Sequence, residues 1–251
     1  MVEPWLLAAL TAVALVAGFI DSIAGGGGLL VMPALLWGGV PPLAALGTNK
    51  LQSVFGTAIA LRNYARSGLV DWRNNLTTIV LAFAGAVAGV IAVRQIRADT
   101  LELVIPLLLV ASALYVLFSP RMTDDDAHKR LSRAGYAPVG TAIGFYDGFF
   151  GPGAGTFYTT SLVALRGAGL TRATALAKMF NLASASASLI MFALGGQIYW
   201  LLGLCMAAGA MAGGWLGSHT ALRFGAGLIR ALLVASSLAL TARLLWGYFA
   251  V

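Results

Sequence analysis

The stretch GFIDSIAGGGGLL, residues 18–30, interrupts a long apolar run with one aspartate and four consecutive glycines. A second stretch, GFYDGFFGPGAGT at 144–156, repeats this pattern at a constant offset of 126 positions, so that Asp21 aligns with Asp147. A match at half the chain length is typical of a duplicated unit. We therefore expect two related halves, each organised around one glycine-rich break.

The composition is that of a membrane protein. Of the 251 residues, 59% are hydrophobic and 10% are charged, and the mean hydropathy is +0.87, whereas a water-soluble surface usually needs far more charge. A membrane-spanning helix needs about 20 mostly apolar residues, and these runs are too long and too uniformly apolar for the strands of a β-barrel. Such runs occur near 4–24, 43–62, 75–93, 101–119, 137–165 with a break, 173–195, 198–218 and 228–249.

The predicted fold class is therefore an all-α integral membrane protein. It has about eight transmembrane helices in two four-helix repeats, with glycine-broken helices at the centre. We divide the chain into a first transmembrane repeat at 1–119, a polar linker at 120–136 and a second transmembrane repeat at 137–251. Four crossings per half would make the repeats parallel and an odd number would make them inverted, and the sequence leaves this open.

The charge pattern points to the lipid bilayer as a partner and not to nucleic acid. The formal net charge is +7, but the lysines and arginines stand mostly at the ends of apolar runs, where such residues set membrane topology. A single cysteine, Cys205, excludes an intrachain disulfide, and we expect no metal or other cofactor. The motifs of an intramembrane hydrolase, GxSxG and HExxH, are absent from the sequence. We expect neither an enzyme nor a purely structural scaffold, and the oligomeric state is left open.

Four ionisable residues lie deep inside apolar runs: Asp21 and Lys50 in the first half, and Asp147 and Lys178 in the second. Each such charge costs about 2.5–3.5 kcal/mol at the centre of a transmembrane helix, so these residues must be paired or must face water. One interpretation is that Asp–Lys ion pairs simply hold the bundle together. The other is a central site at which some of these charges meet a substrate.

The glycine breaks favour the second interpretation. Lipid tolerates a broken helix only where the freed N–H and C=O groups face protein or water. Short helices starting at Leu29 and near Thr156 would direct their N–H groups and positive dipole ends into a shared cavity, and with two lysines they would form an anion site. The alternative is that the glycines serve only to let helices cross closely. This accounts well for one or two glycines, but poorly for four in a row.

These arguments select a set of candidate residues. Asp21 and Asp147 are assigned to charge pairing or proton coupling: they hold the lysines while no substrate is bound, or one of them gains and loses a proton. Ser53, Ser184 and Ser186 are further hydroxyl donors on the lysine-bearing helices. The residues assigned to substrate binding are Lys50, Lys178, Gly26, Gly27, Gly28, Thr48, Asn49, Gln52, Gly153, Gly155 and Asn181.

At GFIDSIAGGGGLLVMPALL, residues 18–36, followed by ALGTNKLQSVFGTA, residues 45–58, the chain resembles the TauE/SafE sulfite exporter family, also called the TSUP family. The resemblance extends over essentially the whole chain. The second half departs from the first, because it reads ATALAKMFNLAS at 173–184 where the first has ALGTNKLQSVFG. The resemblance implies movement of sulfur-containing anions, such as sulfite, sulfoacetate or other organosulfonates, across the bacterial inner membrane.

Together, the residues and the resemblance predict a multi-pass secondary transporter for a small sulfur-containing anion, working as an exporter. An anion channel, or a carrier for a different small organic or inorganic anion, is the alternative, because a charged constriction between two halves can also conduct without alternating access.

Overall fold

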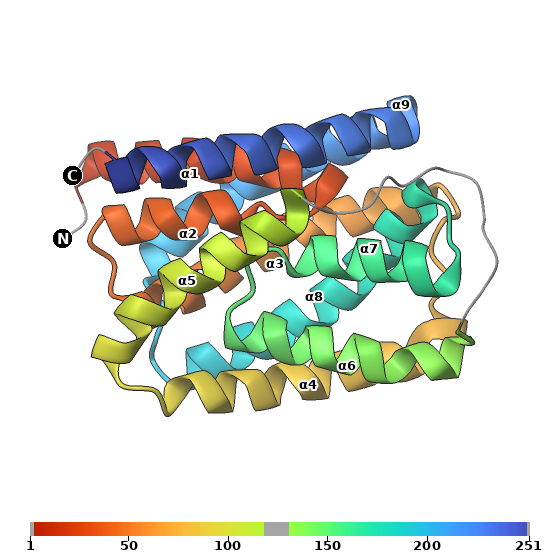
Figure 1. Cartoon of the computed structure of the whole chain (residues 1–251), viewed down its shortest axis with the longest axis horizontal. Coiled ribbons are helices and arrows are strands. Elements are labelled where there is room, and N and C mark those ends of the chain that lie inside the picture. The colour runs from red at the N-terminus through yellow and green to blue at the C-terminus, as the bar shows by residue number, and fades with distance from the viewer. Residues whose placement is uncertain (1–2, 118–130, 250–251) are drawn as a thin grey trace.

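The computed structural model describes residues 3–117 and 131–249, and within them all regular elements are helices (Figure 1). This confirms the predicted all-α class. Most of the linker predicted at 120–136 lies outside the described residues, and the helix that follows it already begins at Arg133. The helices are α1 Pro4–Ala24, α2 Gly28–Trp37, α3 Pro42–Arg66, the 3₁₀ turn η1 Arg73–Asn75, α4 Leu76–Arg94, α5 Ala98–Leu117, α6 Arg133–Phe149, α7 Ala154–Arg166, α8 Leu170–Leu194 and α9 Trp200–Phe249.

Five segments among the described residues are long and apolar enough to cross a membrane, so the predicted count of about eight is not confirmed. Two helices that follow the glycine breaks, α2 and α7, have 10 and 13 residues and are too short to cross alone. The helix α3 is long enough, with 25 residues, but it carries three cationic side chains and is not among the five segments. The five segments are Pro4–Ala24, Arg73–Arg94, Ala98–Tyr115, Leu170–Leu194 and Trp200–Gly225.

The glycine-rich stretches end one helix and begin another, as the sequence predicts. Gly25 has a φ of 74° and Gly153 a φ of 87°, in the left-handed region that favours glycine, so neither α1 nor α6 continues into the next helix. The short helices begin close to the predicted positions, at Gly28 in place of Leu29 and at Ala154 in place of Thr156. Each break is therefore a change of chain direction inside the bundle.

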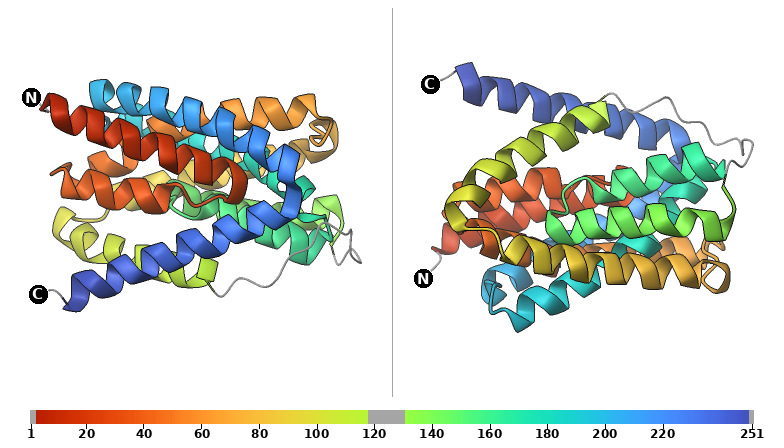
Figure 2. Two further views of the ribbon diagram at one scale, coloured as in Figure 1. Left: turned by 90° about the horizontal axis from the view of Figure 1, so that it is seen from above. Right: turned by 60° about the horizontal axis from the view of Figure 1, so that its bottom comes forward.

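The helices α1 and α6, which lead into the two glycine breaks, run in opposite directions along the long axis of the molecule (Figure 1). The helix α1 starts at the left end of the view and α6 starts at the right end. After each break the short helix folds back beside the one before it, so that α2 and α7 begin near the middle of the molecule and run toward opposite ends (Figures 1 and 2). The amino ends of both short helices therefore lie in the middle of the bundle.

Helices from the first half of the chain pack directly against helices from the second half. The first helix of each half packs on a later helix of the other half, α1 on α9 and α6 on α4. Glycines allow these close crossings: a methyl group built on Gly18 would lie 2.6 Å from the Ala210 carbonyl oxygen, and one built on Gly144 would lie 2.3 Å from that of Ala82. Removing either half would therefore expose the packing surface of the other.

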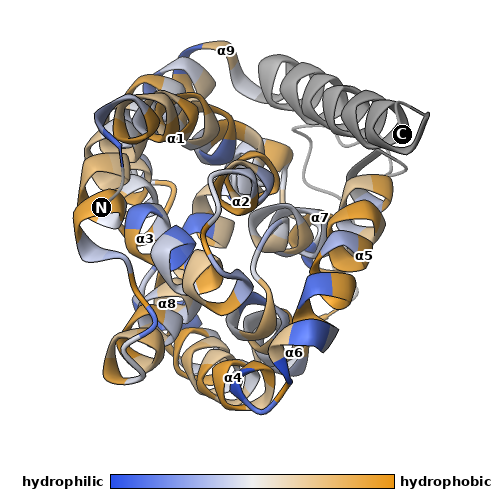
Figure 3. Cartoon of the chain, turned by 90° about the vertical axis from the view of Figure 1, so that its left-hand side faces the viewer, coloured by the Kyte–Doolittle hydropathy of each residue, from blue (hydrophilic) through white to orange (hydrophobic). Residues whose placement is uncertain are grey.

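The outer surface of the bundle is apolar and its middle contains polar groups. Viewed from one end, Figure 3 shows mainly hydrophobic colour along the outer helices α1 and α4, with hydrophilic patches beside α3 toward the centre. The buried polar residues lie mainly on α3 and α8, including Lys50 and Lys178. The last helix, α9, has a non-helical Gly225 with a φ of 64°, where the chain bends. The polar interior is where a binding site has to be sought.

Candidate functional site

The four ionisable residues of the membrane interior form two ion pairs, and each pair joins the two halves of the chain. The Lys50 ammonium lies 2.6 Å from Oδ1 of Asp147, and the Lys178 ammonium lies 2.6 Å from Oδ2 of Asp21. Neither lysine pairs with the aspartate of its own half. The predicted pairing of these charges is thus present, in a crossed arrangement.

The Lys50–Asp147 pair is completely enclosed. Both side chains are 3% exposed, and the second carboxylate oxygen of Asp147 accepts a 2.6 Å hydrogen bond from the Ser184 hydroxyl. Lys50 also donates to the backbone carbonyl of Asp147, near the carboxyl end of α6, where a positive charge is favourable to the helix dipole. Both carboxylate oxygens of Asp147 are therefore occupied by donors.

The Lys178–Asp21 pair is different because its carboxylate is partly accessible. Lys178 is 1% exposed but Asp21 is 21% exposed. Oδ1 of Asp21 accepts a 3.2 Å hydrogen bond from the N–H of Gly27, just before α2 begins. A carboxylate at the amino end of a helix is stabilised by the freed N–H groups and the dipole. In this structure, Asp21 thus occupies the anion-binding position that the first glycine break creates.

The two glycine breaks lie directly against each other. A methyl group built on Gly25 would lie 2.4 Å from the Thr156 amide nitrogen, and one built on Gly28 would lie 3.4 Å from Cβ of Pro152. The Thr156 hydroxyl donates a 3.2 Å hydrogen bond to the carbonyl of Ala24 across the contact. The backbone polar groups freed by one break are thus close to those freed by the other.

One group of predicted binding residues comes together around Lys178. A methyl group built on Gly155 would lie 3.6 Å from both the Lys178 ammonium nitrogen and the Asn181 amide nitrogen. Gly26 faces the Thr156 hydroxyl in the same way, at 3.5 Å. A lysine, an amide and the first turn of α7 therefore converge at this point, which is a set of donors suited to an oxyanion.

A second group lies around the start of α2. The Gln52 amide donates a 2.9 Å hydrogen bond to the Asn49 side-chain oxygen. The amide nitrogen of Asn49 would lie 3.5 Å from a methyl group built on Gly28. Gln52, Gly27 and Gly28 also line one common cavity. Gln52 and Asn49 therefore lie at the first break.

Two predicted residues lie apart from these groups. The Thr48 hydroxyl accepts a 3.1 Å hydrogen bond from the N–H of Tyr199, in the connection that leads to α9. Gly153 faces Ser112 of α5 and the ring of Phe157. Both contacts stabilise the local chain path, and neither brings its residue to the lysines.

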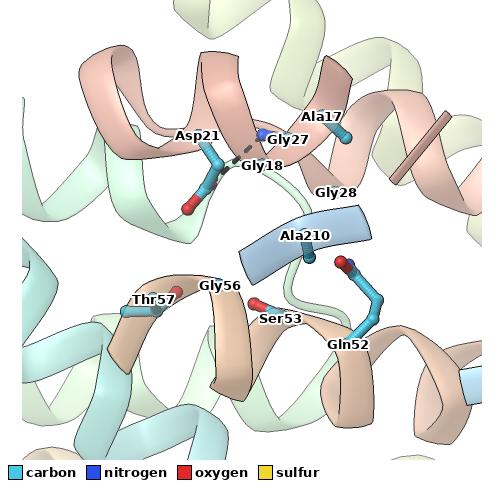
Figure 4. A pocket seen from close by; sticks show the side chains of 10 residues that line it. All are labelled: Ala17, Gly18, Asp21, Gly27, Gly28, Gln52, Ser53, Gly56, Thr57 and Ala210. Atoms are coloured by element: carbon cyan, nitrogen blue, oxygen red, sulfur yellow. Dashed lines mark hydrogen bonds between the residues drawn. The ribbon is translucent and has the colours of Figure 1, made fainter. Parts of the chain in front are cut away.

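The cavity beside Asp21 is small. It has a volume of about 20 Å³ and lies between α1, the start of α2, α3 and α9. Figure 4 shows the Asp21 carboxylate on α1 above the Ser53 and Thr57 hydroxyls of α3. A cavity needs roughly 10–15 Å³ to hold one water molecule, so this space is too small for a sulfur oxyanion. Its lining is Ala17, Gly18, Asp21, Gly27, Gly28, Gln52, Ser53, Gly56, Thr57 and Ala210.

Sequence reasoning missed several residues that shape these groups. Thr57 follows Lys50 by two helical turns on α3, so helical periodicity would have placed both on one face. The Tyr146 hydroxyl donates a 2.6 Å hydrogen bond to the carbonyl of Pro152, and the Tyr64 hydroxyl donates one of 2.8 Å to that of Ser22. Both tyrosines hold the backbone at or near a glycine break, and no local pattern marks them.

With this geometry established, comparison with known proteins gives the family. The sequence matches the family described as sulfite exporter TauE/SafE over residues 10–244. The chain belongs to the TauE/SafE family. No solved structure gives a significant match.

The relatives of this TauE/SafE protein are membrane transporters by name. The probable membrane transporter protein YfcA of Escherichia coli K12 is 41% identical over 247 residues, covering 98% of this chain and 92% of its own. The probable membrane transporter protein ORF9 of a Sinorhizobium species is 44% identical over 241 residues, covering 96% and 92%. A probable membrane transporter protein of Haemophilus influenzae is 41% identical, covering 97% of both chains. The protein is thus a multi-pass membrane transporter.

Proposed function

We propose that the protein is a secondary transporter that exports a small sulfur-containing anion, such as sulfite, sulfoacetate or another organosulfonate, across the bacterial inner membrane. The observation that carries the proposal is the pair of buried lysines, each held by the aspartate of the opposite half beside a glycine break. An anion that replaces an aspartate as the partner of a lysine would find donors already in place. The family name supports a sulfur oxyanion as the substrate class.

The proposed architecture is an inverted repeat. The hairpin α1–α2 enters the bundle from one end and α6–α7 enters from the other (Figure 1). Equivalent contacts support the duplication: Gly85 of α4 meets the backbone of Phe145 on α6, and Gly213 of α9 meets that of Phe19 on α1. The separation of these two glycines along the chain is the same as the separation of Lys50 and Lys178. Inverted repeats are a common basis of alternating access. In this mechanism, one repeat moves against the other around a fixed site.

The size of the cavity favours a carrier over an open channel. At about 20 Å³, the space beside Asp21 has room for a single water molecule. The two breaks are also in direct contact, with Gly25 against Gly155 and Thr156. An anion can then pass only if the two breaks separate, which is the conformational step of a carrier.

The test is anion flux in proteoliposomes, measured with sulfite and with sulfoacetate. We expect Lys178→Ala to lower the flux at least about tenfold, because the site loses its charge, whereas Arg66→Ala leaves it unchanged. Since Lys50→Ala leaves the buried Asp147 without a positively charged partner, the better variant there is the double substitution Lys50→Met with Asp147→Leu, which removes both charges and keeps similar volumes.

Each variant is first checked for a single peak in size-exclusion chromatography. Equal flux through the wild type, Lys178→Ala and the double variant would reject the lysine site. Flux at rates beyond those of a carrier, without counterflow, would indicate the channel alternative.

A further inference from the structure

The cavity beside Asp21 contains a polar group that the protein does not satisfy. Thr57 is 2% exposed, and among the described residues its hydroxyl oxygen has no hydrogen-bond partner. A buried polar group left in this way costs about 1–3 kcal/mol. Thr57 lines the same cavity as the Asp21 carboxylate. Its unsatisfied hydroxyl therefore indicates that this cavity holds a polar ligand.

The size and the lining of the cavity define that ligand. Its volume of about 20 Å³ fits a single water molecule. The carboxylate of Asp21, the amide of Gln52 and the hydroxyls of Ser53 and Thr57 surround it, and a buried water needs 2–4 such partners. Figure 4 shows these groups facing the space between α1 and α3.

The two aspartates differ in their access to such a water. Asp21 is 21% exposed and borders the cavity, whereas Asp147 is 3% exposed and its oxygens are held by Lys50 and Ser184. Of the two aspartates, Asp21 is therefore the one that borders a space able to hold a water molecule.

We propose that this cavity is the proton-uptake site of the transporter: a water bound between Thr57 and Asp21 accepts a proton from bulk water and passes one on to the Asp21 carboxylate, so that the bound water itself is left unchanged. The proton bonds to a carboxylate oxygen, the ion pair with Lys178 is lost, and Lys178 keeps its own proton and positive charge. Lys178 then lies beside Gly155 and Asn181 as an unpaired cation, ready for an anion. The inference rests on the proposed anion transport and assigns the proton role to Asp21 in place of Asp147.

Few other titratable groups face Asp21. From α8 there is Lys178, and from α3 there is Tyr64, which interacts electrostatically with Asp21. The short helix α2 carries no titratable side chain. On α7, the Tyr158 hydroxyl donates a hydrogen bond to the carbonyl of Gly140, and on α9 the His219 ring is hydrogen-bonded to the carbonyl of Trp215. The protonation of Asp21 is therefore coupled chiefly to Lys178.

The first test does not depend on the transported anion. Infrared difference spectra of the protein in liposomes are recorded as the pH is lowered, and the signal of a newly protonated carboxylic acid is followed. We expect this signal in the wild type and in Asp147→Asn, and its loss in Asp21→Asn. A signal that survives Asp21→Asn and disappears in Asp147→Asn would overturn the proposal.

The second test follows proton movement with an internal pH-sensitive dye while sulfite is transported. We expect Thr57→Val, which keeps the shape and removes the hydroxyl, to slow proton movement by about tenfold or more. The control is Thr11→Val, because the Thr11 hydroxyl already binds the carbonyl of Leu7 within α1. Equal proton movement in wild type and Thr57→Val would contradict the proposed water.

The outcomes separate this inference from the proposed function. An Asp21-dependent infrared signal without sulfite flux in any variant would support the proton site and reject sulfite as the substrate. Flux that needs Na⁺ and is unaffected by a pH gradient would overturn the proton role of Asp21. The ion coupled to anion transport would then be Na⁺ and not a proton.

Discussion

Lys50 on α3 donates a 2.6 Å hydrogen bond to the carboxylate of Asp147 on α6, although the two residues are 97 positions apart in the chain. The equivalent bond from Lys178 to Asp21 spans 157 positions. Each half of the protein thus contributes the lysine of one pair and the aspartate of the other. The ion pairs connect the halves beside the contact between the two glycine breaks, which is the contact that opens in the proposed carrier cycle.

The unequal enclosure of the two pairs predicts unequal losses of stability. Lys50→Ala leaves the carboxylate of Asp147 buried at 3% exposure, so we expect a loss of about 3–5 kcal/mol. Lys178→Ala leaves Asp21 at 21% exposure and hydrogen-bonded to Gly27, so the loss should be clearly smaller. Thermal unfolding in detergent, followed by circular dichroism, measures both. The control Arg97→Ala removes an exposed ion pair and should change stability little. Equal losses at the two lysines would argue against the difference in enclosure.

The crossed pairing predicts which double variants recover stability. Asp147→Leu together with Lys50→Met removes a whole pair, so the combined loss should be at least about 1 kcal/mol smaller than the sum of the two single losses. Asp21→Leu with Lys50→Met removes one member of each pair, and we expect no such recovery. Double-mutant cycles from chemical unfolding give the coupling energies. A larger coupling between Lys50 and Asp21 than between Lys50 and Asp147 would refute the crossed arrangement.

The contact between the breaks predicts a strong effect of one added methyl group. Gly25→Ala would place Cβ 2.4 Å from the Thr156 amide nitrogen, and we expect poor folding and loss of flux. Gly39 is a matched control, because its φ of 76° is nearly the same as the 74° of Gly25 but nothing lies within 4 Å of an added methyl group. Gly39→Ala therefore carries only the backbone strain, of order 1–2 kcal/mol. Expression level and flux in liposomes are the measurements, and similar behaviour of the two variants would show that the contact is unimportant.

The same contact predicts a cross-link that stops transport. A Cβ built on Gly28 would lie 3.4 Å from Cβ of Pro152, close to the roughly 3.5–4.5 Å typical of disulfides. In a Cys205→Ser background, Gly28→Cys with Pro152→Cys should oxidise readily and lock the breaks together. We expect flux to fall on oxidation and to return on reduction, with each single cysteine variant as a control. Normal flux in the fully cross-linked protein would show that the breaks stay together during transport.

The sequence by itself determined the helical membrane class, the family, the positions of both glycine breaks and the four charged residues of the interior. Apolar runs, glycine clusters and charges in apolar segments are local features, and their meaning follows from the cost of exposing polar groups to lipid. The short helices begin within two residues of the predicted positions for the same reason. The sequence also provided the candidate residues around Lys178, because Gly155 and Asn181 lie on or near recognisable motifs.

Only the tertiary structure decided how these parts are combined. The crossed pairing of Lys50 with Asp147 depends on α1 and α6 being exchanged between the halves. The opposite directions of α1 and α6, and of α2 and α7, depend on how these helices pack together in the bundle (Figure 1). The difference between an enclosed Asp147 and an accessible Asp21 depends on Ser184 and on a small cavity at Thr57. These are contacts between distant segments, set by packing, and no local pattern in the chain encodes them.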